Sequence, residues 1–347
     1  MKIALITTTI NVPRVLELYR EIDDKSARYL VPVEPTQFFV AGDEKTPAAA
    51  DRFCRDLGYC TYLSLEAQSK WKLSSLIGFN NDSRRNFALL EALRWGAEII
   101  VSVDDDMIPV DRDFFHLVRT TLLNPFSGLK LSSRSWLDTG QHTVPPARAR
   151  GLPLTKPLAT DVDFVVGVPV GVMQGTILGV PDADALVAGS AAPRVTGVDE
   201  VLRAGFVVGL DTPTVFDSQV TAFCRELAPA FAQFYRWQQR NTDIFASVLM
   251  RRIMRGRGLY THFGPPMAYH ARAWRHPLSD LKAELFGLER IAEFSAWLEG
   301  LVIRGGASVL EATRSIYKQA PLDLPWWPDG LAEVTAAWCD DCEEAMA

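Results

Sequence analysis

The chain has no excess of basic residues. Its 347 residues include 36 Lys and Arg against 42 Asp and Glu, which leaves a formal net charge of −6 at pH 7. Proteins that bind nucleic acid usually carry a basic patch, because contacts with the phosphate backbone supply much of the affinity. We therefore expect no nucleic-acid partner. The hydrophobic share of 48% is ordinary for a globular protein with a buried core.

Long apolar runs are also lacking. A membrane-spanning helix needs about 20 consecutive apolar residues, and no stretch of this chain reaches that length. The first apolar run, Lys2–Thr9, is too short for the core of a signal peptide and has no small-residue cleavage site. These absences predict a cytoplasmic protein that does not insert into a membrane.

Cysteine is scarce and its spacing forms no disulfide framework. The count is odd, and only Cys339 and Cys342 have the C-x-x-C spacing. That pair lies in an acidic segment and has no second ligand pair, so we expect no zinc or redox role for it. The five cysteines are Cys54, Cys60, Cys224, Cys339 and Cys342.

The chain lacks two common nucleotide-binding signatures, and it contains no internal repeat. The chain has neither Gly-x-Gly-x-x-Gly nor a P-loop, which argues against a dinucleotide-binding fold and an NTPase. What the first third does contain is a regular alternation of apolar strands and helical segments. This alternation predicts a parallel, nucleotide-binding α/β sheet. The expected strands are Lys2–Thr9, Gln37–Ala41, Cys60–Leu65 and Ile99–Val103.

Three adjacent carboxylates follow the last of these strands. Ile99–Val103 is rich in β-branched residues, as buried strands are, and Asp104, Asp105 and Asp106 come directly after it. Neighbouring carboxylates repel one another beside a core, so a cation is expected there. Hard oxygen ligands suit Mg²⁺ or Mn²⁺ together with phosphate oxygens, and ligands of open α/β sheets bind at the carboxyl ends of strands. The alternative is an Asp-rich turn that caps the next helix.

Further candidate residues lie at the ends of other elements in the first third. Thr7 ends the first strand, where a small hydroxyl can contact a nucleotide or simply cap the strand. Asp43 follows the second strand and suits a base or ribose, although Gly-Asp is also a turn signal. Arg84 and Arg85 lie in the first turn of a helix, where a cation opposes the helix dipole. An anionic ligand would explain them, and solvated surface arginines are the alternative.

The second half offers three more candidates. Residues 125–160 are rich in Pro, Ser and Arg and lack periodicity, so we predict a mobile segment over the site that contains Arg148 and Arg150. Asp243 opens an amphipathic helix, either as a site residue or as a helix cap. His270 ends an apolar stretch, and it is either a metal ligand or a hydrogen-bonded structural histidine.

Taken together, these segments resemble the reversibly glycosylated polypeptides, the UDP-arabinopyranose mutase family, and their bacterial relatives. Asp243 falls on the second aspartate of that family's Asp-Asp-Met-Trp segment, and Arg150-Gly-Leu-Pro153 resembles its Arg-Gly-Tyr-Pro element. No single motif is decisive, but their common order along residues 1–290 is specific. The other segments that carry the resemblance are Ile99–Asp106, Gly167–Pro169, Val180–Asp184, Ala222–Ala230 and Pro266–Ala273.

The resemblance implies a GT-A-type glycosyltransferase fold, with a Rossmann-type mixed α/β sheet flanked by helices. We predict a catalytic domain at 1–277 and a helical C-terminal region at 278–347. Within the catalytic domain, 1–123 is the nucleotide-binding half, 124–160 the mobile segment and 161–277 the sugar and acceptor half.

The resemblance also implies roles for the candidate residues. Asp104, Asp106 and His270 become candidate ligands of Mn²⁺ or Mg²⁺. Thr7 and Asp43 are implied to contact the nucleoside of the nucleotide sugar. The residues expected near the bound diphosphate are Arg84, Asp104 and Asp105.

Arg150 corresponds in this resemblance to the family's reversibly glycosylated arginine. The leading hypothesis is a mutase that interconverts the ring forms of a UDP-sugar, with Arg150 as the glycosylated group or as an electrostatic clamp. Asp243 would orient sugar hydroxyls or act as a base. Two alternatives are a glycosyltransferase with a separate sugar acceptor and a non-catalytic nucleotide-sugar-binding subunit. A homo-oligomer is compatible with each.

Overall fold

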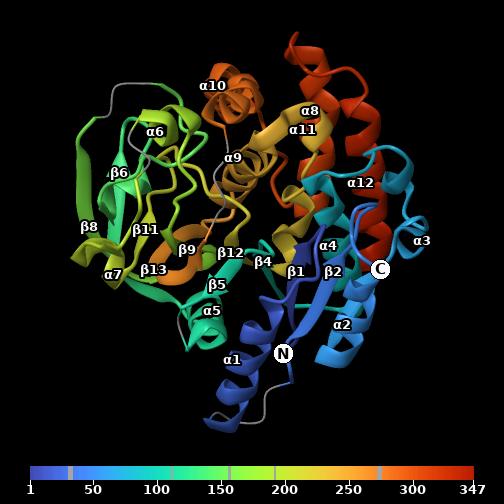
Figure 1. The fold of residues 1–347 in the computed structure, drawn as a ribbon. Coiled ribbons are helices and arrows are strands. Elements are labelled where there is room, and N and C mark those ends of the chain that lie inside the picture. The colour runs from blue at the N-terminus through green and yellow to red at the C-terminus, as the bar shows by residue number, and fades with distance from the viewer. Residues whose placement is uncertain (30–33, 111, 155–157, 191–192, 272–275) are drawn as a thin grey trace.

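The computed structural model describes residues 1–29, 34–110, 112–154, 158–190, 193–271 and 276–347. Its first third alternates strands and helices, as the sequence predicts (Figure 1). Four strands there pair in parallel in the order β3-β2-β1-β4. The elements are β1 (Ile3–Thr8), α1 (Leu16–Tyr29), β2 (Gln37–Ala41), α2 (Ala49–Leu57), β3 (Cys60–Leu63), α3 (Leu65–Gln68), α4 (Arg85–Trp95) and β4 (Ile99–Val103).

The second part of the chain extends the same sheet with strands of both directions. Beyond β4 the order continues β12-β9-β13-β11-β6-β8, with β5 paired to β13. Strand β12 runs antiparallel to β4, whereas β13 runs parallel to β9, so the sheet is mixed. The elements are β5 (Met107–Pro109), α5 (Phe114–Leu123), β6 (Phe126–Ser133), β7 (Thr143–Val144), β8 (Thr160–Val168), β9 (Val170–Gly179), α6 (Ala185–Ser190), β10 (Gly197–Val198), α7 (Glu200–Ala204), β11 (Phe206–Val208), β12 (Val220–Cys224), α8 (Tyr235–Gln238), α9 (Thr242–Arg255) and β13 (Tyr260–His270).

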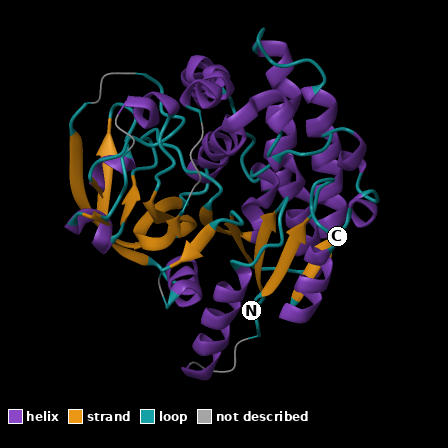
Figure 2. Ribbon diagram, viewed as in Figure 1, coloured by secondary structure: helices purple, strands orange, loops and turns teal. Residues whose placement is uncertain are grey.

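Strand β4 lies in the middle of the sheet because its side chains are apolar on both faces. Ile99, Val101 and Val103 pack into one core, with α1, α2 and α5, and Ile100 packs into the other, with α4 and α9. Successive side chains of a strand point to opposite faces, so a run without polar alternation needs cover on both sides. Figure 2 shows the strands as a continuous band with helices above and below it. The expected mixed α/β sheet flanked by helices is confirmed.

The last part of the chain is helical, as predicted. Trp338 is fully buried, and its indole N–H donates to the carbonyl of Pro229 at 2.8 Å. Asp341 accepts the backbone N–H groups of Lys72 and Leu73 at 3.0 and 2.9 Å, which ties this region to the first third of the chain. No helix of the described residues is long and apolar enough to cross a membrane. The helices are α10 (Pro277–Gly300), α11 (Val309–Asp323) and α12 (Leu331–Met346).

Part of the segment expected to be irregular is a strand. β6 pairs with β11 on one side and β8 on the other, so the prediction of an unstructured segment is wrong for Phe126–Ser133. Most β6 side chains are only half-buried, and the strand therefore lacks the apolar alternation that marks a strand in a sequence. Residues 155–157 of this segment lie outside the described residues.

Candidate active site

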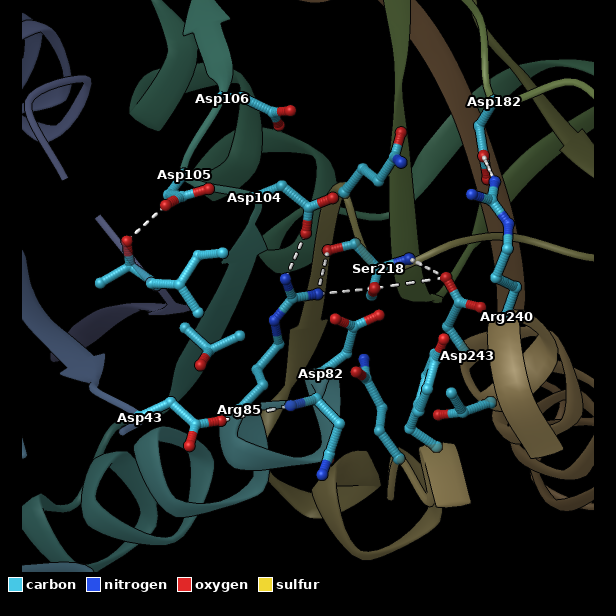
Figure 3. A pocket seen from close by; sticks show the side chains of 18 of the residues that line it. Asp43, Asp82, Arg85, Asp104, Asp105, Asp106, Asp182, Ser218, Arg240 and Asp243 are labelled. Carbon is cyan, nitrogen blue, oxygen red and sulfur yellow. Dashed lines mark hydrogen bonds and ion pairs between the residues drawn. The ribbon is translucent and has the colours of Figure 1, made fainter. Parts of the chain in front are cut away.

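A cavity of about 430 Å³ opens at the carboxyl ends of β1, β2 and β4. Thr8 and Thr9 from the end of β1, Asp43 after β2 and the three aspartates after β4 all line it. Parallel strands bring their carboxyl ends to one edge of a sheet, which explains how residues almost 100 positions apart meet. The far side of the cavity is formed by residues later in the chain, including Asp182 and Asp243 (Figure 3). Arg150 also lines it.

The three adjacent aspartates have three different partners. Asp104 forms an ion pair with Arg85. Asp105 accepts a short hydrogen bond from the hydroxyl of Thr9, and burial, together with the charges of Asp104 and Asp106, raises the pKa of Asp105. Figure 3 shows the three carboxylates spread along the cavity wall and pointing in different directions.

Asp106 lies beside His270, the last residue of β13. The Nε2 atom of His270 is 3.0 Å from Oδ2 of Asp106, and its Nδ1 atom is 3.0 Å from the carbonyl oxygen of Val180. The carbonyl of Val180 can only accept, so Nδ1 carries a proton, and an ionised Asp106 carboxylate likewise accepts from Nε2 when that nitrogen is protonated. Loss of the Nε2 proton would leave the imidazole and the carboxylate as two neighbouring ligand groups for a metal.

The residues around the cavity fit a metal only in part. Within the described ranges, no three His, Cys, Asp or Glu side chains lie close enough together to enclose an ion. Asp106 and His270 are the adjacent pair, while Asp104, which the sequence also predicts as a ligand, is held by Arg85. Two protein ligands suit Mg²⁺ or Mn²⁺ when phosphate oxygens and water complete the coordination.

Of the two residues expected to contact a nucleoside, Asp43 lines the cavity and Thr7 does not. The carboxylate of Asp43 accepts the backbone N–H groups of Glu44 at 2.8 Å and Asn81 at 3.2 Å, which fixes its orientation. Thr7 is fully buried in the sheet and donates its hydroxyl proton to the carbonyl of Thr8. The threonines that line the cavity are Thr8 and Thr9.

Of the two adjacent arginines at the start of α4, Arg85 lines the cavity and Arg84 does not. Arg84 is fully buried with its guanidinium directed at Gln68 and the carbonyl of Gly78, and it stacks on Phe79. Arg85 instead donates to the hydroxyl of Ser218 at 2.6 Å and pairs with Asp104. Arg84 is therefore not placed to contact an anion in the cavity, whereas Arg85 is, because successive residues of a helical turn point about 100° apart.

Arg150 is buried on the far side of the cavity, between two carboxylates. Its Nη2 atom lies 2.8 Å from Asp182 and 2.9 Å from Asp243, and its Nη1 atom donates to the carbonyl of Arg240. Burial lowers the pKa of Arg150, but the charges of Asp182 and Asp243 outweigh this effect and raise it well above its ordinary value. Arg150 is therefore a fixed cation.

Asp243 is held as firmly as Arg150. One carboxylate oxygen accepts the backbone N–H of Ser218 at 3.1 Å, and the other accepts the N–H of Ile244 at 3.0 Å. Both oxygens also accept from Arg150. A carboxylate surrounded in this way orients its neighbours, and little of its acceptor capacity is left for a proton in transit.

Several cavity residues were not identified as site candidates from the sequence. Asp182 lies in the loop after β9, Arg240 lies in a short 3-10 helix before α9, and Ser218 precedes β12 by two residues. Asp82 also lines the cavity, where burial and the charge of Asp104 raise its pKa. The one available signal was the resemblance at Val180–Asp184, which includes Asp182.

Comparison with known proteins gives only a distant structural likeness. No family model matches the chain, and no curated protein matches it either. Glucosyl-3-phosphoglycerate synthase from Mycobacterium tuberculosis in complex with phosphoglyceric acid is similar over 88% of this chain and 82% of that chain, with a TM-score of 0.45 and 14% identity. The same enzyme with Mn²⁺ and UDP-glucose gives a TM-score of 0.44 and 13% identity over 88% and 81%.

A crystal structure described as a mycobacterial protein gives similar values. It covers 87% of this chain and 76% of its own, with a TM-score of 0.44 and 14% identity. Similarity at this level does not assign the chain to a family.

Proposed function

We propose that this chain is a metal-dependent enzyme of the GT-A type that acts on a nucleoside diphosphate sugar. The supporting observation is a single cavity of about 430 Å³, a size typical of ligand sites, that joins three sets of groups. Asp43 and the threonines lie at one end, the Asp106–His270 pair lies at the edge of the sheet, and Arg150 with Asp243 lies opposite. A nucleotide sugar has its nucleoside, diphosphate and sugar in the same order as these three sets of groups.

For the metal, we propose Asp106 and His270 as protein ligands. Both side chains line the cavity and approach each other at 3.0 Å. A bound Mg²⁺ or Mn²⁺ would neutralise charge on the diphosphate as the glycosyl–phosphate bond breaks. The carbonyl of Val180 accepts the Nδ1 N–H of His270, so the orientation of the ring is set before a metal arrives.

For the diphosphate, we propose Arg85 as the cation supplied by the chain. Its guanidinium is buried and held in place by the hydroxyl and carbonyl oxygens of Ser218. A planar guanidinium suits bidentate contact with phosphate oxygens. Asp104 keeps this cation oriented toward the cavity through their ion pair.

For the sugar, we propose that Arg150 acts as a charged positioning group. The guanidinium is already bonded on all three nitrogens, to Asp182, Asp243 and the carbonyl of Arg240. A guanidinium stabilised in its protonated form is a poor nucleophile. This observation favours transfer without a glycosyl-arginine intermediate, whereas the resemblance at Arg150–Pro153 supports a ring-form mutase. The two candidates share the cleavage step and differ in what accepts the sugar.

Binding experiments test the shared part of the proposal. Titration calorimetry with UDP should show binding that strengthens when Mn²⁺ is present. Asp106→Asn and His270→Ala should each remove the effect of Mn²⁺, while Asp56→Asn, an exposed aspartate on α2 outside the cavity, should not. A UDP affinity that does not change on addition of Mn²⁺, or on substitution of Asp106 or His270, would rule out the proposed metal site.

Product analysis then separates the reactions. Incubation with UDP-arabinopyranose and Mn²⁺, followed by chromatography, yields UDP-arabinofuranose if the chain is a mutase. UDP that appears only after a sugar acceptor is added identifies a transferase. Tight binding without turnover across several UDP-sugars would support the non-catalytic alternative.

A further inference from the structure

A second, smaller cavity of about 90 Å³ adjoins the main one. Arg150 and Asp182 line both cavities, so the second lies directly behind the proposed sugar end of the first. Much of its wall is apolar, with contributions from Val215, Phe216 and Phe263. A small apolar recess with a few placed polar groups is suited to part of an organic ligand.

Asp217 supplies an acidic group to this second cavity. Its Oδ1 atom accepts the backbone N–H of Gln219 at 2.8 Å and the side-chain N–H of Gln174 at 3.1 Å. Gln174 is itself oriented by the hydroxyl of Thr221. In the part of the chain that the structure describes, no hydrogen bond to Oδ2 of Asp217 is seen. This second oxygen is the one left for a ligand.

The charges around Asp217 favour its neutral form. Burial, and then the carboxylates of Asp182 and Asp243, raise the pKa of Asp217 to about 7, while Arg150 acts in the opposite direction. Because Oδ1 already accepts two N–H groups, the proton of the neutral acid belongs on Oδ2. A protonated carboxyl oxygen can donate to a hydroxyl, and an ionised one can accept from it.

We infer that the second cavity receives the hydroxyl-bearing end of the donor sugar, and that Asp217 hydrogen-bonds there and selects a neutral sugar over one carrying a carboxylate. This inference rests on the proposed function, because the sugar reaches the cavity only if the nucleotide lies along the main one. A uronic acid would bring its carboxylate against Asp217 and Asp182, which costs binding energy when Asp217 is ionised.

The test compares UDP-glucose with UDP-glucuronate by titration calorimetry in the presence of Mn²⁺. At pH 8 the parent protein should bind UDP-glucose at least about tenfold more tightly, a difference of roughly 1.4 kcal/mol. The difference in affinity between the two UDP-sugars should be smaller at pH 6, where Asp217 is protonated. Asp217→Asn should reduce this difference at pH 8 as well, and it should leave the affinity for UDP unchanged. Asp211→Asn, at an exposed aspartate before β12, serves as the matched control.

The outcomes distinguish a failure of the proposed function from a failure of the role assigned to the second cavity. If UDP does not bind the parent protein, the proposed function fails, and this inference fails with it. If UDP binds normally but Asp217→Asn keeps the parent's preference at both pH values, the sugar does not reach Asp217 and only the second cavity's assignment is overturned.

An independent feature is the exposed apolar face of β8, at the edge of the sheet. Val162, Phe164 and Val166 alternate along the strand, so they share one face, and they are 59%, 67% and 77% exposed. Among the described residues, β8 pairs only with β6 and leaves its outer edge open. Natural proteins usually blunt or cover such edges, because an open apolar strand pairs with other chains.

The sequence of β8 is complementary to itself in the antiparallel direction. Pairing two copies about Phe164 would place Val162 opposite Val166, so that apolar side chains meet. The same register places Asp161 opposite Gly167 and Asp163 opposite Val165, so that no carboxylate faces another. Parallel pairing in register would set each aspartate beside its own copy. We propose that two copies of this chain associate through antiparallel pairing of their β8 strands.

Light scattering coupled to size exclusion tests this association. The parent chain should have the mass of a dimer, and Val166→Glu and Phe164→Glu should each have the mass of a monomer with unchanged circular dichroism. Val302→Glu, at a residue 96% exposed between α10 and α11, should stay dimeric. A monomeric parent, or β8 variants that remain dimeric, would overturn the proposal.

Discussion

Arg150 and Asp243 form a buried ion pair in one wall of the cavity, with Nη2 and Oδ2 2.9 Å apart and side chains only 6% and 8% exposed. The two residues are 93 positions apart in the sequence. Asp243 opens α9, and Arg150 belongs to the loop between β7 and β8. The pair therefore connects α9 to the loop between β7 and β8.

Replacing both members of this pair should cost less stability than the sum of replacing each one alone. Asp243→Ala leaves Arg150 partly uncompensated and should lower the free energy of unfolding by about 3 kcal/mol, as for other buried pairs that lose one partner. The double variant Arg150→Met, Asp243→Leu should lose less than the sum of the single variants. Urea denaturation measures all three, and additive losses would show that the pair carries no coupling energy.

The adjacent arginines Arg84 and Arg85 should separate stability from ligand binding. Arg84→Met removes buried hydrogen bonds to Gln68 and the Gly78 carbonyl, and should cost about 1–3 kcal/mol of stability with little change in UDP affinity. Arg85→Met should weaken UDP binding by about tenfold or more through a lost charge-assisted contact. Calorimetry and urea denaturation on both variants check this division. Equal UDP affinities would contradict the role proposed for Arg85.

The sequence predicts those parts of the site that depend on one continuous stretch. The β4 run and the three aspartates after it need only local information, because a strand buried on both faces has a recognisable composition. Local sequence does not tell which of Arg84 and Arg85 faces the cavity. Both are polar residues at the start of one helix, and only the packing of α4 against the sheet decides which of them faces the cavity.

Long-range contacts explain what could not be predicted. Asp182 meets Arg150 across 32 positions, and Ser218 meets Arg85 across 133. Neither contact leaves a local pattern, because each depends on strand order in the second half of the sheet. The same holds for β6, whose partners β11 and β8 define it as a strand although its own side chains do not alternate.

Asp217 should make the protein less stable as the pH rises from about 4 to about 7. Its pKa is raised to about 7 in the folded state, whereas an unfolded aspartate titrates near 3.9. The folded state therefore binds more protons in this window, and stability falls with increasing pH. Asp217→Asn keeps the acceptor for Gln174 and Gln219 and removes the titration. Between pH 4 and pH 7, the stability of the parent relative to this variant should fall by more than about 1 kcal/mol.

His262 should have the opposite effect on the acid side. Burial lowers the pKa of this β13 histidine to about 4, its Nδ1 atom has no hydrogen-bond partner, and its ring packs edge-on against Phe126. The unfolded histidine, with a pKa near 6.5, binds a proton first. Stability should therefore fall as the pH drops from about 6.5 to about 4.

His262→Phe removes this titrating group and keeps a ring against Phe126. The parent should lose about 3 kcal/mol more than this variant over that interval, since each unit of pKa difference corresponds to about 1.4 kcal/mol. Urea denaturation at pH 6.5, 5.5 and 4.5 gives the comparison. Parallel pH profiles for parent and variant would mean that the fold accommodates a charged imidazole between β11 and β9, the strands that flank His262.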